Sequence, residues 1–130
     1  MAAQKVGSVS EKVIKLLGLT DISVNAPIYL GDSNINHMKS RHPNDYLKYG
    51  ADISMIINDA DYVGLNASDN SIEYVKEYKI NNEFVKVAVR VSQGNVLYAR
   101  SIYILNNKRV QNYIAKNTLK KTWQTVDNDV

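Results

Sequence analysis

The sequence predicts a single α+β domain in which N-terminal helices pack on a C-terminal antiparallel β-meander and a last helix closes the chain. Three observations predict this class. Apolar residues recur mainly at helical spacing up to residue 58, alternate with polar residues from 72 to 105, and return to helical spacing after 106. Helices and strands that are segregated along the chain in this way are typical of α+β architecture.

The first helix is predicted by its caps and by its apolar side. Residues 1–7 carry no periodic pattern, so we expect a loose lead-in there. Ser8 or Ser10 can cap the helix that follows, and Gly18 ends it. Its apolar side carries Val13, Ile14, Leu16 and Leu17. A short apolar strand, residues 28–30, follows Pro27.

A second helix is expected from about residue 34 to 41, with Asp32 or Ser33 as its N-cap. Pro43 disfavours a helical conformation at the residue before it, so this helix should stop at His42. In an unbroken helix His37 and His42 would lie about 140° apart around the axis. The break frees the side chain of His42 to face the same pocket as His37.

Shorter elements connect this helix to the meander. Residues 44–49 predict another short helix, and residues 51–58 predict a helix with an apolar stripe of Ile53, Ile56 and Ile57. A short strand is expected at residues 62–65.

The meander is predicted from three alternating segments, residues 72–80, 84–92 and 96–105. The buried row of the middle segment is Val85, Val87, Val89 and Val91. The opposite row exposes Lys86 and Arg90, and a neighbouring strand can place Ser101 and Tyr103 beside them. Residues 106–121 return to helical spacing, and residues 122–130 are expected to form a flexible tail.

The composition limits the chemistry of the chain. Its 130 residues, 45% of them hydrophobic, suffice for one domain with one core. The net charge of +3 permits a nucleic-acid partner without requiring one. No cysteine is present, which excludes disulfides, thiolate metal ligands and a cysteine nucleophile. With two histidines in the chain, we expect no metal site and no cofactor.

The sequence also predicts where the protein acts. No apolar run approaches the roughly 20 residues of a membrane span. The first five residues lack the apolar core of a secretion signal. We therefore expect no membrane partner and a cytoplasmic location, which is the host cytosol if the protein is delivered as a toxin.

The segment from His37 to Pro43 carries the clearest chemical signal. It holds both histidines together with Lys39 and Arg41. Histidine has an unperturbed pKa near 6.5, so it exchanges protons near neutral pH, and two such side chains beside two cations suit the acid–base cleavage of a polyanion. The alternative is a solvated, basic helix end with two incidental histidines.

Three segments, in their order along the chain, resemble the phage-associated nucleases of the barnase–EndoU–colicin–RelE superfamily. These segments are residues 37–43, residues 71–76 (Ser-Ile-Glu-Tyr-Val-Lys) and residues 98–103 (Tyr-Ala-Arg-Ser-Ile-Tyr). The resemblance runs from about residue 27 to 121. It implies a nuclease domain over 27–121, preceded by a helical lead-in, 1–26, and followed by the tail, 122–130.

The resemblance implies a metal-independent endoribonuclease, with RNA (tRNA among the candidates) as substrate and an immunity or antitoxin protein as a further partner. In such enzymes the 2′-hydroxyl of the RNA attacks phosphorus and leaves a 2′,3′-cyclic phosphate. His37 and His42 would be the acid–base pair, Lys76 would lie against the phosphate, and Ser101 would bond a phosphate oxygen. The expected substrate-binding residues are Lys39, Arg41, Lys86, Arg90, Arg100 and Tyr103.

Other interpretations stay open at this level. Lys76 can be an ordinary strand lysine, Ser101 a polar residue on a wet sheet face, and Tyr103 a packing residue. The whole domain can also bind nucleic acid without cutting it, through basic and tyrosine side chains on the sheet. A phage structural or interaction protein is a third possibility.

Overall fold

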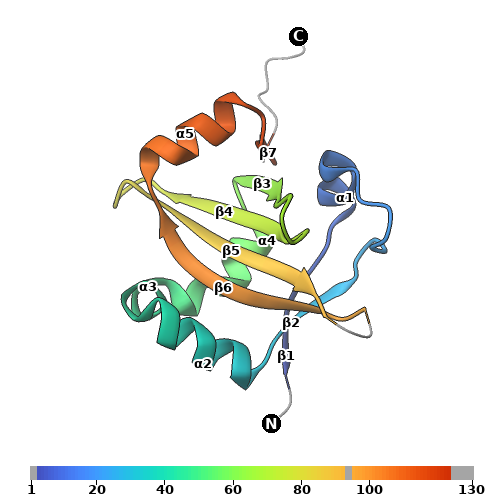
Figure 1. Ribbon diagram of the computed structural model, residues 1–130, viewed down its shortest axis with the longest axis horizontal. Coiled ribbons are helices and arrows are strands. Elements are labelled where there is room, and N and C mark those ends of the chain that lie inside the picture. The colour runs from blue at the N-terminus through green and yellow to red at the C-terminus, as the bar shows by residue number, and fades with distance from the viewer. Residues whose placement is uncertain (1–2, 93–94, 124–130) are drawn as a thin grey trace.

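The computed structural model describes residues 3–92 and 95–123, and it confirms the α+β class (Figure 1). One seven-stranded sheet has the strand order β1-β2-β6-β5-β4-β3-β7. The strands are β1 (Gln4–Ser8), β2 (Pro27–Leu30), β3 (Tyr62–Leu65), β4 (Ile72–Tyr78), β5 (Glu83–Val91), β6 (Leu97–Leu105) and β7 (Leu119–Lys121). The helices are α1 (Glu11–Leu17), α2 (Asp32–Arg41), α3 (Pro43–Tyr49), α4 (Ile53–Asn58) and α5 (Asn107–Ala115), with a 3₁₀ turn, η1 (Gly50–Asp52), before α4.

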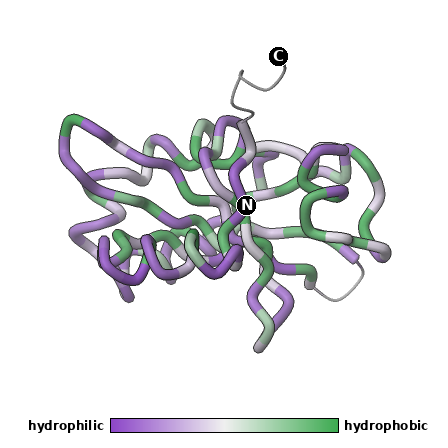
Figure 2. Tube along the Cα trace, turned by 90° about the horizontal axis from the view of Figure 1, so that it is seen from above, coloured by the Kyte–Doolittle hydropathy of each residue, from purple (hydrophilic) through white to green (hydrophobic). Residues whose placement is uncertain are grey.

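The meander of β4, β5 and β6 forms the middle of the sheet. All pairings between neighbouring strands are antiparallel except that of β2 with β6, which is parallel. The register of β5 against β6 slips between Ala88 and Val89, so that Arg100 is the extra residue of a β-bulge. Hydrophobic and hydrophilic residues alternate along the strands, as the hydropathy colouring of Figure 2 shows.

The main core lies on one face of this sheet. Val85, Val87 and Val89 are fully buried there, as the alternation predicted. α4 covers this face, because it contacts both β4 and β5 and lies behind the meander in Figure 1. The prediction for the fourth valine was wrong: Val91 is 42% exposed, since it is the last residue of β5 and lines an open cleft beside residues 18–22.

The opposite face is only partly covered. α5 packs over one end of it and forms a second, smaller cluster of buried residues: Tyr62, Val75, Phe84, Val110 and Leu119. The remaining residues of this face belong mainly to β4, β5 and β6. We call this uncovered part the open face.

α2 and α3 lie along the free edge of β6 (Figure 1). β2 pairs with β6 only at Leu97 and Tyr98, so the rest of that edge is left to these helices. Asp45 of α3 satisfies one backbone group of this free edge: its carboxylate accepts a hydrogen bond from the backbone N–H of Ile104 at 3.0 Å. α2, which carries His37, and the junction with α3, which carries His42, therefore lie against β6.

Two terminal strands differ from the sequence prediction. Residues 4–8 form β1, which pairs with β2, whereas a loose lead-in was expected. The last helix was expected to reach residue 121, but it ends at Ala115, and Asn117 takes a left-handed backbone conformation (φ 61°) that turns the chain into β7. β7 then pairs with β3. β1 and β7 pair with backbone N–H and C=O groups of β2 and β3 that would otherwise lack hydrogen-bond partners. The spacing of apolar residues within one segment does not reveal such long-range pairing.

The ends of the predicted helices are mostly as expected. The Ser10 side chain accepts from the Val13 N–H, and Gly18 ends α1 in the left-handed region (φ 65°). α2 begins differently: Gly31 is its N-cap, and its N–H donates to the Asn34 side chain at 2.9 Å. Of the predicted flexible tail, residues 122 and 123 belong to the described chain and Thr122 donates its N–H to the Asp61 carbonyl, while residues 124–130 lie outside the described residues.

Met38 anchors α2 in the main core, and its truncation should loosen the helix that carries His37. The Met38 side chain is fully buried, whereas that of Met55 on α4 is 39% exposed. We expect Met38→Ala to lower the free energy of unfolding by about 2–5 kcal/mol, because it removes buried apolar volume. Met55→Ala should cost much less. Urea denaturation followed by circular dichroism measures both, and an equal effect of the two changes would contradict this role of Met38.

Candidate functional site

The predicted break between the two histidines is present. α2 ends at Arg41, and His42 has a non-helical backbone (φ −139°, ψ 65°) before Pro43 starts α3. The half-buried His42 ring turns towards the sheet and stacks on the Tyr103 ring of β6, with 4.9 Å between the ring centroids and 25° between their planes. The proline therefore presents one of the two imidazoles to β6.

Tyr103 joins His42 to a buried ion pair on the open face. Lys86 faces Tyr103 across β5 and β6, and its Nζ lies 4.7 Å from the centroid of the tyrosine ring. The same Nζ lies 2.9 Å from Oε2 of Glu73 on β4. The Lys86 and Glu73 side chains are only 12% and 15% exposed, respectively, and Asn66 donates a further hydrogen bond to Glu73.

The Lys86 ammonium is stabilised in its charged form. Burial alone lowers its pKa, but hydrogen bonds to Tyr103 and Glu73 and the negative charge of Glu73 outweigh burial and raise the pKa above the ordinary 10.5. Lys86 is therefore a fixed cation at neutral pH. A fixed cation on an open sheet face is suited to attract a phosphate group.

Ser101 and Arg90 lie on the same open face. Ser101 pairs with Ala88 next to the Lys86–Tyr103 pair, and its side chain is half-buried. Arg90 pairs with Tyr98, but its Nη1 lies 3.3 Å from Oδ2 of Asp69. Hydrogen bonds from the side chain and backbone of Ser71, together with Arg90, lower the pKa of Asp69, so Arg90 faces a charged carboxylate.

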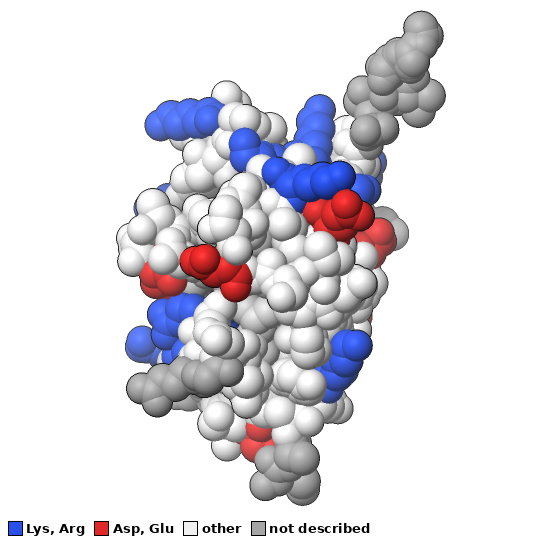
Figure 3. All heavy atoms as spheres, turned by 90° about the vertical axis from the view of Figure 1, so that its right-hand side faces the viewer, with Lys and Arg blue, Asp and Glu red and all other residues white. Residues whose placement is uncertain are grey.

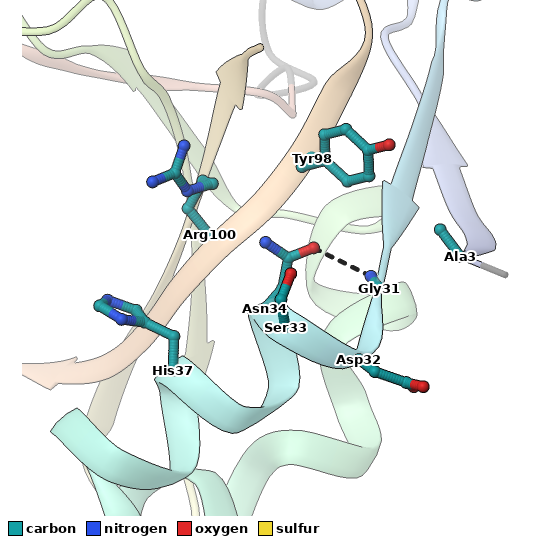
Figure 4. Close-up of a pocket in the computed structure, with 8 residues that line it drawn as sticks. All are labelled: Ala3, Gly31, Asp32, Ser33, Asn34, His37, Tyr98 and Arg100. Atoms are coloured by element: carbon teal, nitrogen blue, oxygen red, sulfur yellow. Dashed lines mark hydrogen bonds between the residues drawn. The ribbon is translucent and has the colours of Figure 1, made fainter. Parts of the chain in front are cut away.

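His37 lines a cleft at the beginning of β6 that His42 does not line, so the two histidines do not share one pocket as predicted. This cleft has a volume of about 610 Å³, and Figure 4 shows His37 projecting from α2 on the same side as Arg100 of β6. Tyr98, Asn34 and Gly31 form further parts of its wall. The β-bulge explains the position of Arg100, because an extra residue re-aims its side chain. Here an imidazole and a guanidinium border one cavity.

A second cleft lies at the other end of β6, where α5 meets the open face. Its volume is about 590 Å³, and its walls include Glu73, Lys86, Tyr103, Arg109 and Tyr113. Glu73, Arg109 and Tyr113 were not predicted as site residues, although Glu73 lies in residues 71–76, one of the three segments that carry the family resemblance. Strand alternation placed Glu73 on the opposite face from Tyr74, but only the register of β4 against β5 brings it to Lys86.

Six of the predicted site residues line neither of these two clefts: His42, Ser101, Arg90, Lys76, Lys39 and Arg41. The first three lie on or beside the open face, as described above. Lys76 points from β4 to the other face of the sheet, where its Nζ lies 3.0 Å from Oδ2 of Asp59 and 3.6 Å from Oδ1 of Asp61. Lys39 lies over the Tyr46 ring, and Arg41 is exposed at the end of α2. Neither lines the two clefts along β6.

Within residues 3–92 and 95–123, no group of three or more histidine, cysteine, aspartate or glutamate side chains is arranged to hold a metal ion. In the same part of the chain, no helix has the length and apolar character that crossing a bilayer requires. Histidines, cations, hydroxyls and the carboxylates of Glu73 and Asp69 make up the candidate site along β6 and its neighbours.

The fold and the site define a small α+β domain in which α2 and the residue before α3 place imidazoles near cationic side chains of β5 and β6. Residues 4–112 match the model of the phage-Barnase-EndoU-ColicinE5/D-RelE like nuclease3 family, and the chain belongs to this nuclease family. The match begins at β1 and ends within α5, so it contains most of the residues that line the two clefts, among them His37, Arg100, Lys86 and Tyr103. No curated protein and no solved structure was found to match the chain.

Proposed function

We propose that this protein is a metal-independent endoribonuclease that uses the 2′-hydroxyl of its RNA substrate as nucleophile and leaves a 2′,3′-cyclic phosphate. Membership in a nuclease family supports nuclease activity. The observation that carries the proposal further is the stack of His42 on Tyr103 beside the Lys86 ammonium. It places an imidazole near an ammonium that stays charged, although that ammonium is largely buried and paired with Glu73.

The proposed reaction needs two proton transfers and one site of charge stabilisation. A base takes the proton of the 2′-hydroxyl, the 2′-oxygen bonds to phosphorus, the bond from phosphorus to the 5′-oxygen breaks, and an acid protonates that oxygen. His37 and His42 are the proposed acid–base pair. Lys86 and the Ser101 hydroxyl are the proposed partners of the phosphate oxygens, since both lie on the open face next to Tyr103.

Arg100 is proposed to bind the same scissile phosphate from the side of His37. Both side chains line the cleft at the beginning of β6, and a guanidinium can form two parallel hydrogen bonds to one phosphate. Arg109 would extend the basic surface in the second cleft. Lys76 is left out of this proposal because two aspartates engage it on the other face of the sheet.

We further propose a folded RNA such as tRNA as the substrate and a cytoplasmic place of action, with an immunity or antitoxin protein as inhibitor if the protein is a toxin. The place of action rests on the requirement that a ribonuclease meets accessible RNA, which the cytoplasm supplies. Co-purification of RNA or of a small acidic protein with the inactive enzyme would identify such partners.

A denaturing gel tests the proposed reaction. We expect the purified protein to cut tRNA in the presence of a chelator and to leave 3′ ends that carry a cyclic phosphate. An oligonucleotide with 2′-deoxyribose at each position should stay intact, because it lacks the nucleophile. Lys76→Met should cut like the wild type. Cleavage of the deoxy substrate would contradict the mechanism, and salt-sensitive binding of intact RNA would indicate a binding module instead.

A further inference from the structure

Lysine side chains from different parts of the chain meet at the far edge of the sheet, away from β6. Lys15, Lys120 and Lys121 line a hollow of about 450 Å³ between α1, the end of α5 and β7. We call this place the lysine hollow. Figure 3 shows basic side chains gathered over the upper part of the side of the molecule on which α1 and β7 lie.

The charges of the lysine hollow are weakly compensated. Lys15 pairs with Glu11 at 3.2 Å, but the two side chains are 75% and 65% exposed, and such surface pairs contribute little. Lys121 lies over the ring of Trp123, with 4.8 Å from its Nζ to the ring centroid. Among the residues that the structure describes, Lys120 and Lys121 form no ion pair. The hollow is therefore a region of positive potential.

Protection of a sheet edge explains only part of this arrangement. β7 is an edge strand of three residues, and lysines on edge strands hinder pairing with other chains. That role accounts for Lys120 and Lys121. It does not account for Lys15, which reaches the same hollow from α1. Convergence of cations from separate elements around one concave surface is what binding of a polyanion requires.

We infer that the lysine hollow binds the sugar–phosphate backbone of a single-stranded part of the RNA substrate, and that Trp123 stacks a base beside it. The Trp123 side chain is 44% exposed, and aromatic platforms next to cations are typical of single-strand binding. The inference rests on the proposed function. Four strand spacings separate β6 from β7, about 19 Å, so a dinucleotide at β6 is too short to reach the hollow, while a longer RNA can.

Binding of an RNA that cannot be cut tests this inference independently of catalysis. The probe is a long single-stranded 2′-O-methyl RNA with a fluorescent label, and its affinity is measured by anisotropy over a range of salt concentrations. We expect the triple change Lys15→Gln, Lys120→Gln and Lys121→Gln to lower the slope of log affinity against log salt by about 2, since each single-strand phosphate contact contributes about 0.7. Trp123→Ala should weaken binding without changing this slope.

A matched triple change controls for net charge. Lys5→Gln, Lys79→Gln and Lys108→Gln remove three exposed lysines elsewhere and should leave the slope nearly unchanged. If both triple variants lose affinity equally, or if the hollow variant binds like the wild type, the inference is overturned, and an acidic protein becomes the alternative occupant. If the wild type cuts no RNA but the hollow variant alone loses binding, the proposed function fails and the inference stands.

Discussion

Replacing His42 by alanine is expected to lower the rate of RNA cleavage by about 100-fold or more, because a general acid or base contributes about 10²–10⁴-fold. The side chain makes no capping hydrogen bond for α2 or α3, so the two helices keep their ends. Loss of the stack on Tyr103 should lower stability only by about 0.5–1.5 kcal/mol. Single-turnover cleavage of a labelled RNA measures the rate.

His42→Phe separates proton transfer from ring packing. A phenyl ring can keep the stack on Tyr103 but carries no exchangeable proton, so we expect stability near that of the wild type and a rate as low as that of His42→Ala. A Phe variant as active as the wild type would show that the histidine acts only by packing.

The other histidine tests whether the two act together. If His37 and His42 form one acid–base pair, the double alanine variant should be hardly slower than the slower single variant, because residues that act as a unit have non-additive effects. Independent, multiplying losses would contradict the pairing of the two side chains in one reaction. This result matters because His37 lines the first cleft, whereas His42 stacks on a residue of the second.

Lys86→Met is expected to reduce both stability and activity. It leaves the Glu73 carboxylate, which is 15% exposed, without its cation, and breaking a buried pair in this way costs about 3 kcal/mol. Under the proposed mechanism Lys86 contacts the reacting phosphate, so its removal should lower the cleavage rate by about 100-fold. Chemical denaturation and single-turnover kinetics measure the two effects.

A second substitution distinguishes the structural role of Lys86 from its chemical role. In Lys86→Met with Glu73→Leu, no charge is left unpaired, so most of the lost stability should return, as it does when buried pairs are replaced by apolar residues. The cleavage rate should stay low. Recovery of the rate together with stability would show that Lys86 acts only by holding the fold.

The pH dependence of this stability difference has a defined sign. The folded state raises the pKa of Lys86 despite its burial, so the stabilising effect of the charged form is fully present below the ordinary value of 10.5. It is lost as the pH rises through the raised folded value. The stability gap between the wild type and Lys86→Met should therefore be constant across neutral and mildly alkaline pH.

The sequence alone determined the features that depend on local sterics and on periodicity. Pro43 restricts the backbone of the residue before it, so the break at His42 could be predicted without any knowledge of the sheet. Strict alternation likewise placed Val85 and Val87 in the core and Lys86 on the opposite face. The resemblance to the nuclease superfamily also came from the order of local segments, and the family match confirmed it.

Only the tertiary structure decided which distant groups meet. The register of β4 against β5 brings Glu73 to Lys86, and docking of α2 and α3 on the free edge of β6 brings His42 to Tyr103. The register of β4 against β5 also places Lys76 on the face of the sheet opposite Lys86, where Lys76 forms ion pairs with Asp59 and Asp61. Periodicity fixes which residues of one strand share a face, but the pairing of strands and the docking of helices depend on long-range burial and hydrogen bonding, which local spacing does not encode.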